Sequence, residues 1–281
     1  MVRCRSWQFA YRLAAIIGVL VAAGCSSGPT YPRDRLVDGL QAVLHEDGVT
    51  NATVRLLDHT LAVQVEYPGA LLQQGEDIGL GPNFDDAARI VTGGIHRVLL
   101  STDAQVDFYV ILLSDPQAPG AYLTIVRYFD DIRRANVNML DITEILSRTI
   151  FELNLVGTEQ PLTLDQYIPR DIELPEFLSW QLARRIQREL AEELQLSDVA
   201  VGRCGGEFHD GEFAFTLNVV PAENEAIDEE TIRKVFQSAT QTVAQVLSSY
   251  EFESFESVRL IHPGTGRNLV LPRTNLDVFR R

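Results

Sequence analysis

Lysine, cysteine and tryptophan are scarce in this 281-residue chain. It has one lysine, Lys234, among 24 basic residues, together with three cysteines and two tryptophans. A single lysine leaves almost no room for lysine-based catalysis. Only Trp180 lies beyond the N-terminal region, at helical spacing among leucines, so no stacked-aromatic platform for sugars or nucleotides is expected.

The first 25 residues have the three parts of an export signal. Arg3, Arg5 and Arg12 are basic, residues 13–23 carry no charge, and residues 22–25 place small side chains before a cysteine. The uncharged run is about half as long as a membrane-spanning helix of roughly 20 residues, which disfavours a permanent transmembrane segment. This stretch resembles the signal peptide of bacterial lipoproteins, with a lipobox that ends at the cysteine.

The resemblance implies that residues 1–24 are removed and that Cys25 carries a diacylglyceryl group, as the site of lipid attachment. Two or three acyl chains anchor a protein firmly, because each buried methylene contributes about 0.8 kcal/mol. Ser26 follows the cysteine. In Gram-negative lipoproteins, a residue other than aspartate at this position generally directs the protein to the outer membrane. In a Gram-negative host, Ser26 therefore implies that the protein is anchored in the outer membrane and faces the periplasm. Residues 25–33 then form a lipidated tether that reaches at most about 26 Å beyond the cysteine. The alternative is an ordinary cleaved signal with a chance cysteine.

The chain is acidic, and cleavage makes it more so. Residues 1–24 contain three of the 24 bases and none of the 39 acids, so the remaining chain has 21 bases and a formal charge of −18. Such a surface repels phosphates and anionic headgroups, so nucleic acid is not an expected partner. With Cys4 removed and Cys25 lipidated, Cys204 is alone and no internal disulfide is expected.

Hydrophobic periodicity predicts a first α+β domain over residues 34–156. A helix from about Asp34 to Asp47 precedes a hairpin with a two-residue turn at Asp58-His59. The turn gives three cross-strand pairs on one face: Leu56 with Leu61, Val54 with Val63, and Ala52 with Val65. After these come a loop (68–82), a helix (83–101), two strands (106–113 and 121–128), a short helix from residue 129 and a helix over 141–153. Gly93-Gly94 in mid-helix indicates close packing of helix on sheet.

A linker over residues 157–175 is interrupted by prolines, and a second α+β domain follows over 176–281. Its predicted elements are a helix (176–195), a hairpin around 210–211, a helix (228–249), two strands (255–261 and 267–271) and a short C-terminal helix. A shift of 148 residues aligns apolar positions of the two halves, such as Phe84 with Ile232 and Val110 with Val258, which indicates an internal duplication. The expected fold is two similar αββαββ domains. Each is a mostly antiparallel four-stranded sheet with helices on one face, leaving the other face to meet the opposite half.

Motifs for catalysis or metal binding are largely missing. His45 lacks the second histidine of a zinc-binding helix, because position 49 is valine, and no nucleophile elbow, phosphate loop or dinucleotide turn occurs. Residues 262–266 are interpreted as a hairpin turn, and His96 as a residue at the boundary of the core. The acidic run 223–230 lacks the spacing of a calcium loop, and Asp228 is explained as a helix N-cap. No metal or cofactor is expected.

Cys204 is the one residue that invites a catalytic hypothesis. A turn at 210–211 gives the pairs Phe208 with Phe213, Gly206 with Phe215, Cys204 with Leu217, and Gly202 with Val219. This register points Cys204 into the core, where its thiol pKa is raised, and points His209 to the opposite face.

Two functions remain open. The first is a membrane-anchored, non-enzymatic binding or assembly module for a protein or another envelope component. The alternative is an envelope enzyme with a site between the two domains or around Cys204 and His209.

Overall fold

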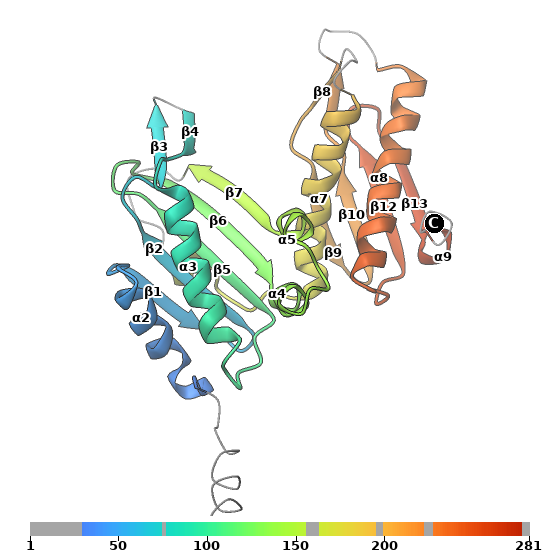
Figure 1. The fold of residues 1–281 in the computed structure, drawn as a ribbon. Helices are drawn as coiled ribbons and strands as arrows, with labels where there is room; N and C mark the ends of the chain where they lie inside the picture. Colours follow the sequence, from blue (N-terminus) through green and yellow to red (C-terminus); the bar gives the residue numbers. More distant parts are fainter. Residues whose placement is uncertain (1–29, 75–76, 156–162, 195–198, 222–226, 277–281) are drawn as a thin grey trace, which may run out of the picture.

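The computed structural model describes residues 30–74, 77–155, 163–194, 199–221 and 227–276, which form two α/β lobes (Figure 1). The predicted signal peptide, Cys25 and the tether up to residue 29 lie outside these residues. Within the described part of the chain, no helix combines the length and the apolar character that crossing a membrane requires.

The first lobe is built on a five-stranded mixed sheet, with the strand order β1-β2-β5-β6-β7. Strands β2 and β5 are parallel, and the other neighbours are antiparallel. The elements are η1 (Arg33–Arg35), α2 (Leu36–Glu46), β1 (Ala52–Leu56), β2 (Thr60–Glu66), β3 (Leu71–Gln74), β4 (Asp77–Leu80), α3 (Phe84–Leu99), β5 (Phe108–Ser114), β6 (Ala121–Tyr128), α4 (Phe129–Asn136), α5 (Ile142–Arg148) and β7 (Ile150–Leu155). The predicted hairpin register is confirmed at all three pairs.

Helices α2 and α3 cover one face of this sheet, and their apolar stripes meet its core. The explanation for Gly93-Gly94 is wrong. A Cβ atom at Gly94 would lie 3.1 Å from Leu44 of α2, whereas nothing lies within 4 Å of the Cβ position at Gly93. Gly94 therefore permits close packing of helix on helix, and Gly93 faces open space.

Two predicted segments differ from the structure. The helix predicted over 141–153 ends at Arg148, and residues 150–155 form β7, because antiparallel pairing with β6 outweighs the local helical pattern. Asp141 does cap α5, since its carboxylate accepts a hydrogen bond from the Glu144 N–H at 2.8 Å. The loop predicted over 68–82 contains the hairpin β3–β4.

The second lobe has a four-stranded mixed sheet, with the order β13-β12-β10-β9. Strands β10 and β12 are parallel, and the other neighbours are antiparallel. Its elements, after the connecting α6 (Leu164–Tyr167), are α7 (Leu174–Glu193), β8 (Val199–Val201), β9 (Gly205–His209), β10 (Glu212–Thr216), β11 (Val219–Pro221), α8 (Glu229–Ser249), β12 (Ser257–His262), β13 (Arg267–Pro272) and α9 (Arg273–Leu276). Asp228 caps α8 as predicted, accepting from the Thr231 N–H.

The predicted register of the second hairpin is confirmed for the pairs near the turn, but it differs by one residue at Val219, further from the turn. Phe208 pairs with Phe213 and Gly206 with Phe215. Val219, however, pairs with Val201 rather than with Gly202, in the separate β8–β11 pair. The Gly202 N–H instead donates to the carbonyl oxygen of Asn218 at 2.7 Å, so the two-residue turn does not fix the register beyond β9.

The second face of the first sheet is not covered by its own helices, and the second half of the chain packs against it. One apolar core runs from Val110 and Leu112 of β5 to Phe177 and Leu182 of α7. The Phe108 and Phe177 rings lie 5.2 Å apart. Residues 163–173, at the end of the predicted linker, contribute Leu164, Ile168 and Ile172 to this core. The first sheet thus has α2 and α3 on one face and the second half of the chain on the other, and the two lobes share a core.

Buried polar side chains also join the lobes. Arg148 of α5 pairs with Asp131 of α4 at 2.8 Å, and both side chains are about 5% exposed. The Tyr250 hydroxyl, at the end of α8, donates to Asp131 at 3.1 Å. Gln181 of α7 donates to the Arg148 carbonyl at 2.7 Å and to the Tyr250 oxygen at 2.9 Å. These four residues form the interlobe lock.

Candidate functional site

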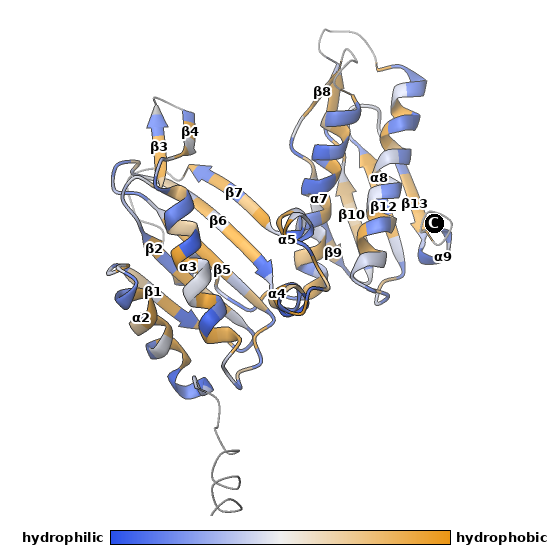
Figure 2. Cartoon of the chain, viewed as in Figure 1, coloured by the Kyte–Doolittle hydropathy of each residue, from blue (hydrophilic) through white to orange (hydrophobic). Residues whose placement is uncertain are grey.

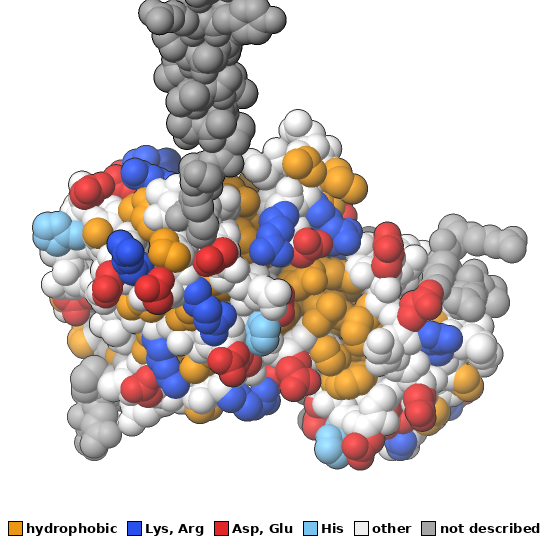
Figure 3. All heavy atoms as spheres, turned by 90° about the horizontal axis from the view of Figure 1, so that it is seen from below, with side chains coloured by type: hydrophobic (Ala, Val, Ile, Leu, Met, Phe, Trp, Pro, Cys, Tyr) orange, Lys and Arg blue, Asp and Glu red, His pale blue; other side chains and the backbone are white. Residues whose placement is uncertain are grey.

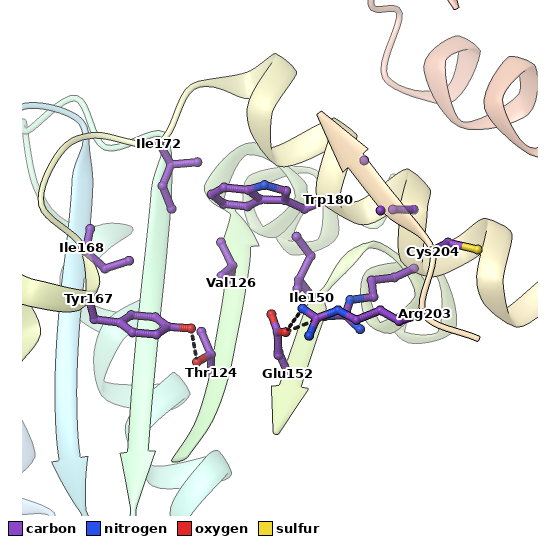
Figure 4. Close-up of a pocket in the computed structure, with 14 residues that line it drawn as sticks. Thr124, Val126, Ile150, Glu152, Tyr167, Ile168, Ile172, Trp180, Arg203 and Cys204 are labelled. Atoms are coloured by element: carbon purple, nitrogen blue, oxygen red, sulfur yellow. Dashed lines mark hydrogen bonds and ion pairs between the residues drawn. The ribbon is translucent and has the colours of Figure 1, made fainter. Parts of the chain in front are cut away.

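A pocket of about 360 Å³ lies where the two lobes meet. Its walls come from five segments: strands β6 and β7 of the first sheet, residues 167–172, the middle of α7, and residues 203–206 (Figure 4). Figure 3 shows hydrophobic side chains gathered at the surface between the lobes on the face seen from below. Pockets between domains are common ligand sites, so this pocket is the candidate site.

The sheet wall follows from strand alternation. Thr124 and Val126 of β6, with Ile150 and Glu152 of β7, point to the face that the second half covers. The Thr124 hydroxyl lies 2.6 Å from the hydroxyl of Tyr167, which fixes that ring against the sheet. The wall is therefore apolar, with polar groups near its edge.

Trp180 forms the opposite side, and its indole lies between Ile172 and Val126 in Figure 4. Its side chain is only partly covered, at 37% exposure, whereas Leu178 and Leu182 are fully buried. The helical spacing of Trp180 grouped it with the leucines of the same helix and did not predict that it lines a pocket. The signal was available, since at 100° per residue Trp180 points about 200° away from both leucines.

The rim carries charge of both signs. Glu152 accepts a hydrogen bond from Arg184 at 2.6 Å and a second from Arg203. Two guanidinium groups therefore share one carboxylate, which gives the rim an excess positive charge within an acidic protein. Arg203 is 69% exposed, so its guanidinium, although bonded to Glu152, is accessible to an anionic group in the pocket.

Cys204 lines the pocket but is 3% exposed, which confirms its predicted burial. Burial raises the pKa of its thiol, which makes it a weak nucleophile. His209 lies at the tip of the β9–β10 hairpin, is 87% exposed, and pairs with Asp210 at 3.0 Å. The fold does not bring the two residues of the catalytic hypothesis together.

The remaining histidine predictions have clear outcomes. The Nε2 atom of His96 lies 2.8 Å from the Tyr109 hydroxyl, and burial, together with the charge of Arg127, lowers the pKa of His96 to about 4. His262 is fully buried at the end of β12, where its ring binds Thr265 and the Val219 carbonyl, next to the predicted turn. In the described ranges, no three acidic, histidine or cysteine side chains are grouped to hold a metal ion.

Comparison with protein-family models and with curated proteins gives no match to this chain.

Proposed function

We propose that this protein is an outer-membrane lipoprotein, anchored through Cys25, that acts as a non-enzymatic binding module of the cell envelope. The observation that carries the proposal is the pocket between the lobes, which combines an apolar wall, a partly exposed tryptophan and an arginine-rich rim. These are features of a ligand site, and the buried thiol of Cys204 supplies no activated nucleophile.

The chemistry of the pocket indicates the class of ligand. The apolar residues, with Trp180, suit a hydrocarbon or aromatic body. The excess guanidinium at the rim suits one carboxylate, sulfonate or phosphate group. We therefore infer that the ligand is an amphipathic envelope component with an apolar body and a single anionic group.

Trp180 makes this inference directly measurable, because it is the only tryptophan after residue 24. Titration of residues 26–281 with decanoate, followed by tryptophan emission, is expected to give a saturable change. Decylamine, which has the same chain and the opposite charge, is expected to give none.

Replacing one rim arginine separates specific binding from general affinity for apolar compounds. Arg203→Ala is expected to weaken decanoate binding about tenfold, since a charge-assisted hydrogen bond contributes roughly 1.5–3 kcal/mol. Arg97→Ala removes an exposed arginine of α3 that does not line the pocket, and should leave affinity unchanged. Equal binding of decanoate and decylamine, or no saturable signal with either, would contradict the proposal.

The anchor has its own test. Expression of the full chain in a Gram-negative host with labelled palmitate should label the wild type, and Cys25→Ala should carry no label. Cys204→Ala is the matched control, because it removes a buried cysteine and should retain the label. Equal labelling of the wild type and Cys25→Ala would end the lipoprotein hypothesis.

We also propose that the two lobes descend from one duplicated αββαββ unit. Two observations support it: both sheets place a parallel pair between two antiparallel neighbours, and each parallel pair is joined through a long helix. The shift of 148 residues carries α3 into α8 and β5 onto β12. Strand β7, which has no counterpart in the second sheet, would then be an addition to the first lobe.

A further inference from the structure

Six large apolar side chains are exposed along one border of the first lobe. We call them the apolar strip, and they are Leu80, Ile142, Leu146, Phe151, Leu153 and Leu155, exposed by 37–67%. Strand β7 forms the middle of the strip, β4 packs against β7, and Leu146 lines a small pocket of about 190 Å³ together with Phe151. Figure 2 shows the hydrophobic colouring along part of β7, next to β6 at the edge of the sheet.

Three residues of the apolar strip, Phe151, Leu153 and Leu155, lie on the face of the first sheet that carries α2 and α3. Phe151 and Leu153 of β7 are opposite Ile125 and Leu123 of β6, which belong to the core beneath these helices. Five strands at about 4.8 Å spacing are roughly 24 Å wide, whereas two packed helices cover about 20 Å. Because α2 packs over β1 at the far edge, the width of about one strand remains bare at β7.

The charged side chains next to the apolar strip indicate the charge of a partner that would cover it. Arg185 and Arg188 of α7 line the same small pocket as Leu146 and Phe151. Both arginines lie 3.8 Å from a single carboxylate, that of Glu189. Glu144 of α5, between Ile142 and Leu146, is paired with Arg148, so Arg185 and Arg188 with their one shared carboxylate give this end of the strip an excess positive charge, in a chain whose formal charge is −15. An acidic partner complements this border, whereas the rest of the protein repels an anionic membrane surface.

We propose that the apolar strip receives an acidic amphipathic helix from a partner protein of the envelope. The apolar face of this helix lies on β7 and α5 beside α3, and its acidic side chains lie next to Arg185 and Arg188. A helix covers the exposed faces of Phe151 and Leu153, whereas a strand added to the edge of β7 extends the sheet and leaves them bare. About 13 helical residues match the length of β7.

Crosslinking in intact envelopes tests this proposal with the full-length, lipidated protein. A photoreactive phenylalanine at Leu153 is expected to crosslink one protein, and mass spectrometry of the joined peptide identifies the occupant. The expected peptide has apolar residues at three- and four-residue spacing together with acidic residues. The same probe at Asn154, whose side chain points to the opposite face of β7, should not give this product.

Any other outcome of the crosslinking overturns the proposal. An adduct with lipid indicates a membrane surface, and an adduct with a second copy of this chain indicates self-association. A peptide with strictly alternating apolar residues indicates strand addition, and no adduct indicates an uncovered surface. These results are independent of decanoate binding, because the residues of the apolar strip do not line the pocket between the lobes.

Charge changes test the same interface with the probe moved to Phe151. Leu153→Asp and Arg188→Glu should each lower the yield of the product at least fivefold. Asn154→Asp, which adds the same charge as Leu153→Asp on the other face, should not lower the yield. Thermal unfolding monitors the fold of each variant. Unchanged yields with Leu153→Asp and Arg188→Glu in folded protein would refute the assigned helix.

Discussion

The pKa values of two residues of the first lobe, Tyr109 and His96, are set by burial more than by neighbouring charge. The Tyr109 hydroxyl accepts a hydrogen bond from Arg127, yet burial raises the pKa of Tyr109 to about 12. His96 contacts the same hydroxyl, and burial is the first cause of its lowered pKa, ahead of the charge of Arg127. Desolvation disfavours the charged form of each group, so both remain neutral near pH 7.

A pH dependence of stability follows from His96. Above about pH 6.5 its imidazole is neutral in both the folded and the unfolded chain, so the difference in pKa has no effect there. Between pH 6.5 and about 4 the unfolded chain binds a proton that the folded chain does not. The free energy of unfolding therefore decreases as the pH is lowered through this range. At pH 5 the loss from this group is about 2 kcal/mol.

Urea unfolding of the wild type and His96→Gln at pH 7 and pH 5 measures this loss. The amide still reaches the Tyr109 hydroxyl but does not titrate, so the variant should lose about 2 kcal/mol less than the wild type. His45→Gln, at an exposed histidine, should behave like the wild type. A parallel fall for His96→Gln and the wild type would show that His96 is not responsible.

At the scale of elements, each lobe depends on how one long helix packs. Helix α3 lies against α2 through Gly94, and α7 approaches β9 through Gly206, where an added Cβ would lie 2.3 Å from the Ser179 carbonyl oxygen. Glycine lowers helix stability by about 1 kcal/mol relative to alanine, so Gly94 lowers the intrinsic stability of α3 while allowing the contact with α2.

The adjacent glycines of α3 form a matched pair of sites. Gly93→Ala places its methyl group in open space and should raise the free energy of unfolding by about 0.5–1 kcal/mol, through helix propensity. Gly94→Ala should give less, or a net loss, because its Cβ would lie 3.1 Å from the Leu44 side chain. Urea denaturation of both variants measures the difference. A larger gain at Gly94 than at Gly93 would contradict the packing described here.

For the whole molecule, the interlobe lock joins the two lobes beside the apolar core that they share. Asp131 and Arg148 come from the first half, and Gln181 and Tyr250 come from the second. Breaking a buried ion pair by removing one partner typically costs 3–5 kcal/mol, because the other charge is left without compensation. Within the described residues, the Gln181 Oε1 atom is buried without a hydrogen-bond partner, so the lock leaves one buried polar atom unsatisfied.

Arg148→Ala should therefore destabilise the protein by about 3–5 kcal/mol and loosen the joint between the lobes. Tyr250→Phe removes only a hydroxyl group and should cost about 1–2 kcal/mol. Urea unfolding monitored by Trp180 emission and by circular dichroism is expected to give coincident curves for the wild type and separate curves for Arg148→Ala. If the curves of Arg148→Ala remain coincident and its stability is unchanged, the lock does not couple the lobes.

The sequence alone determined features that depend on neighbours along the chain. The Asp58-His59 turn and the alternation beside it predicted the β1–β2 register, and Asp228 predicted the start of α8, because turns and caps are local interactions. The burial of Cys204 was predicted from the register that the turn at 210–211 sets in the second hairpin.

Only the tertiary structure decided features that depend on distant partners. Residues 150–155 became a strand because β6 was available to pair with them, and the shift at Val219 depended on β8. The pocket joins segments spread between residues 124 and 206, so no local pattern could place Trp180 opposite Val126 or bring Arg184 and Arg203 onto Glu152. Local pattern sets the direction of a side chain within its own element, whereas packing between elements sets what it faces.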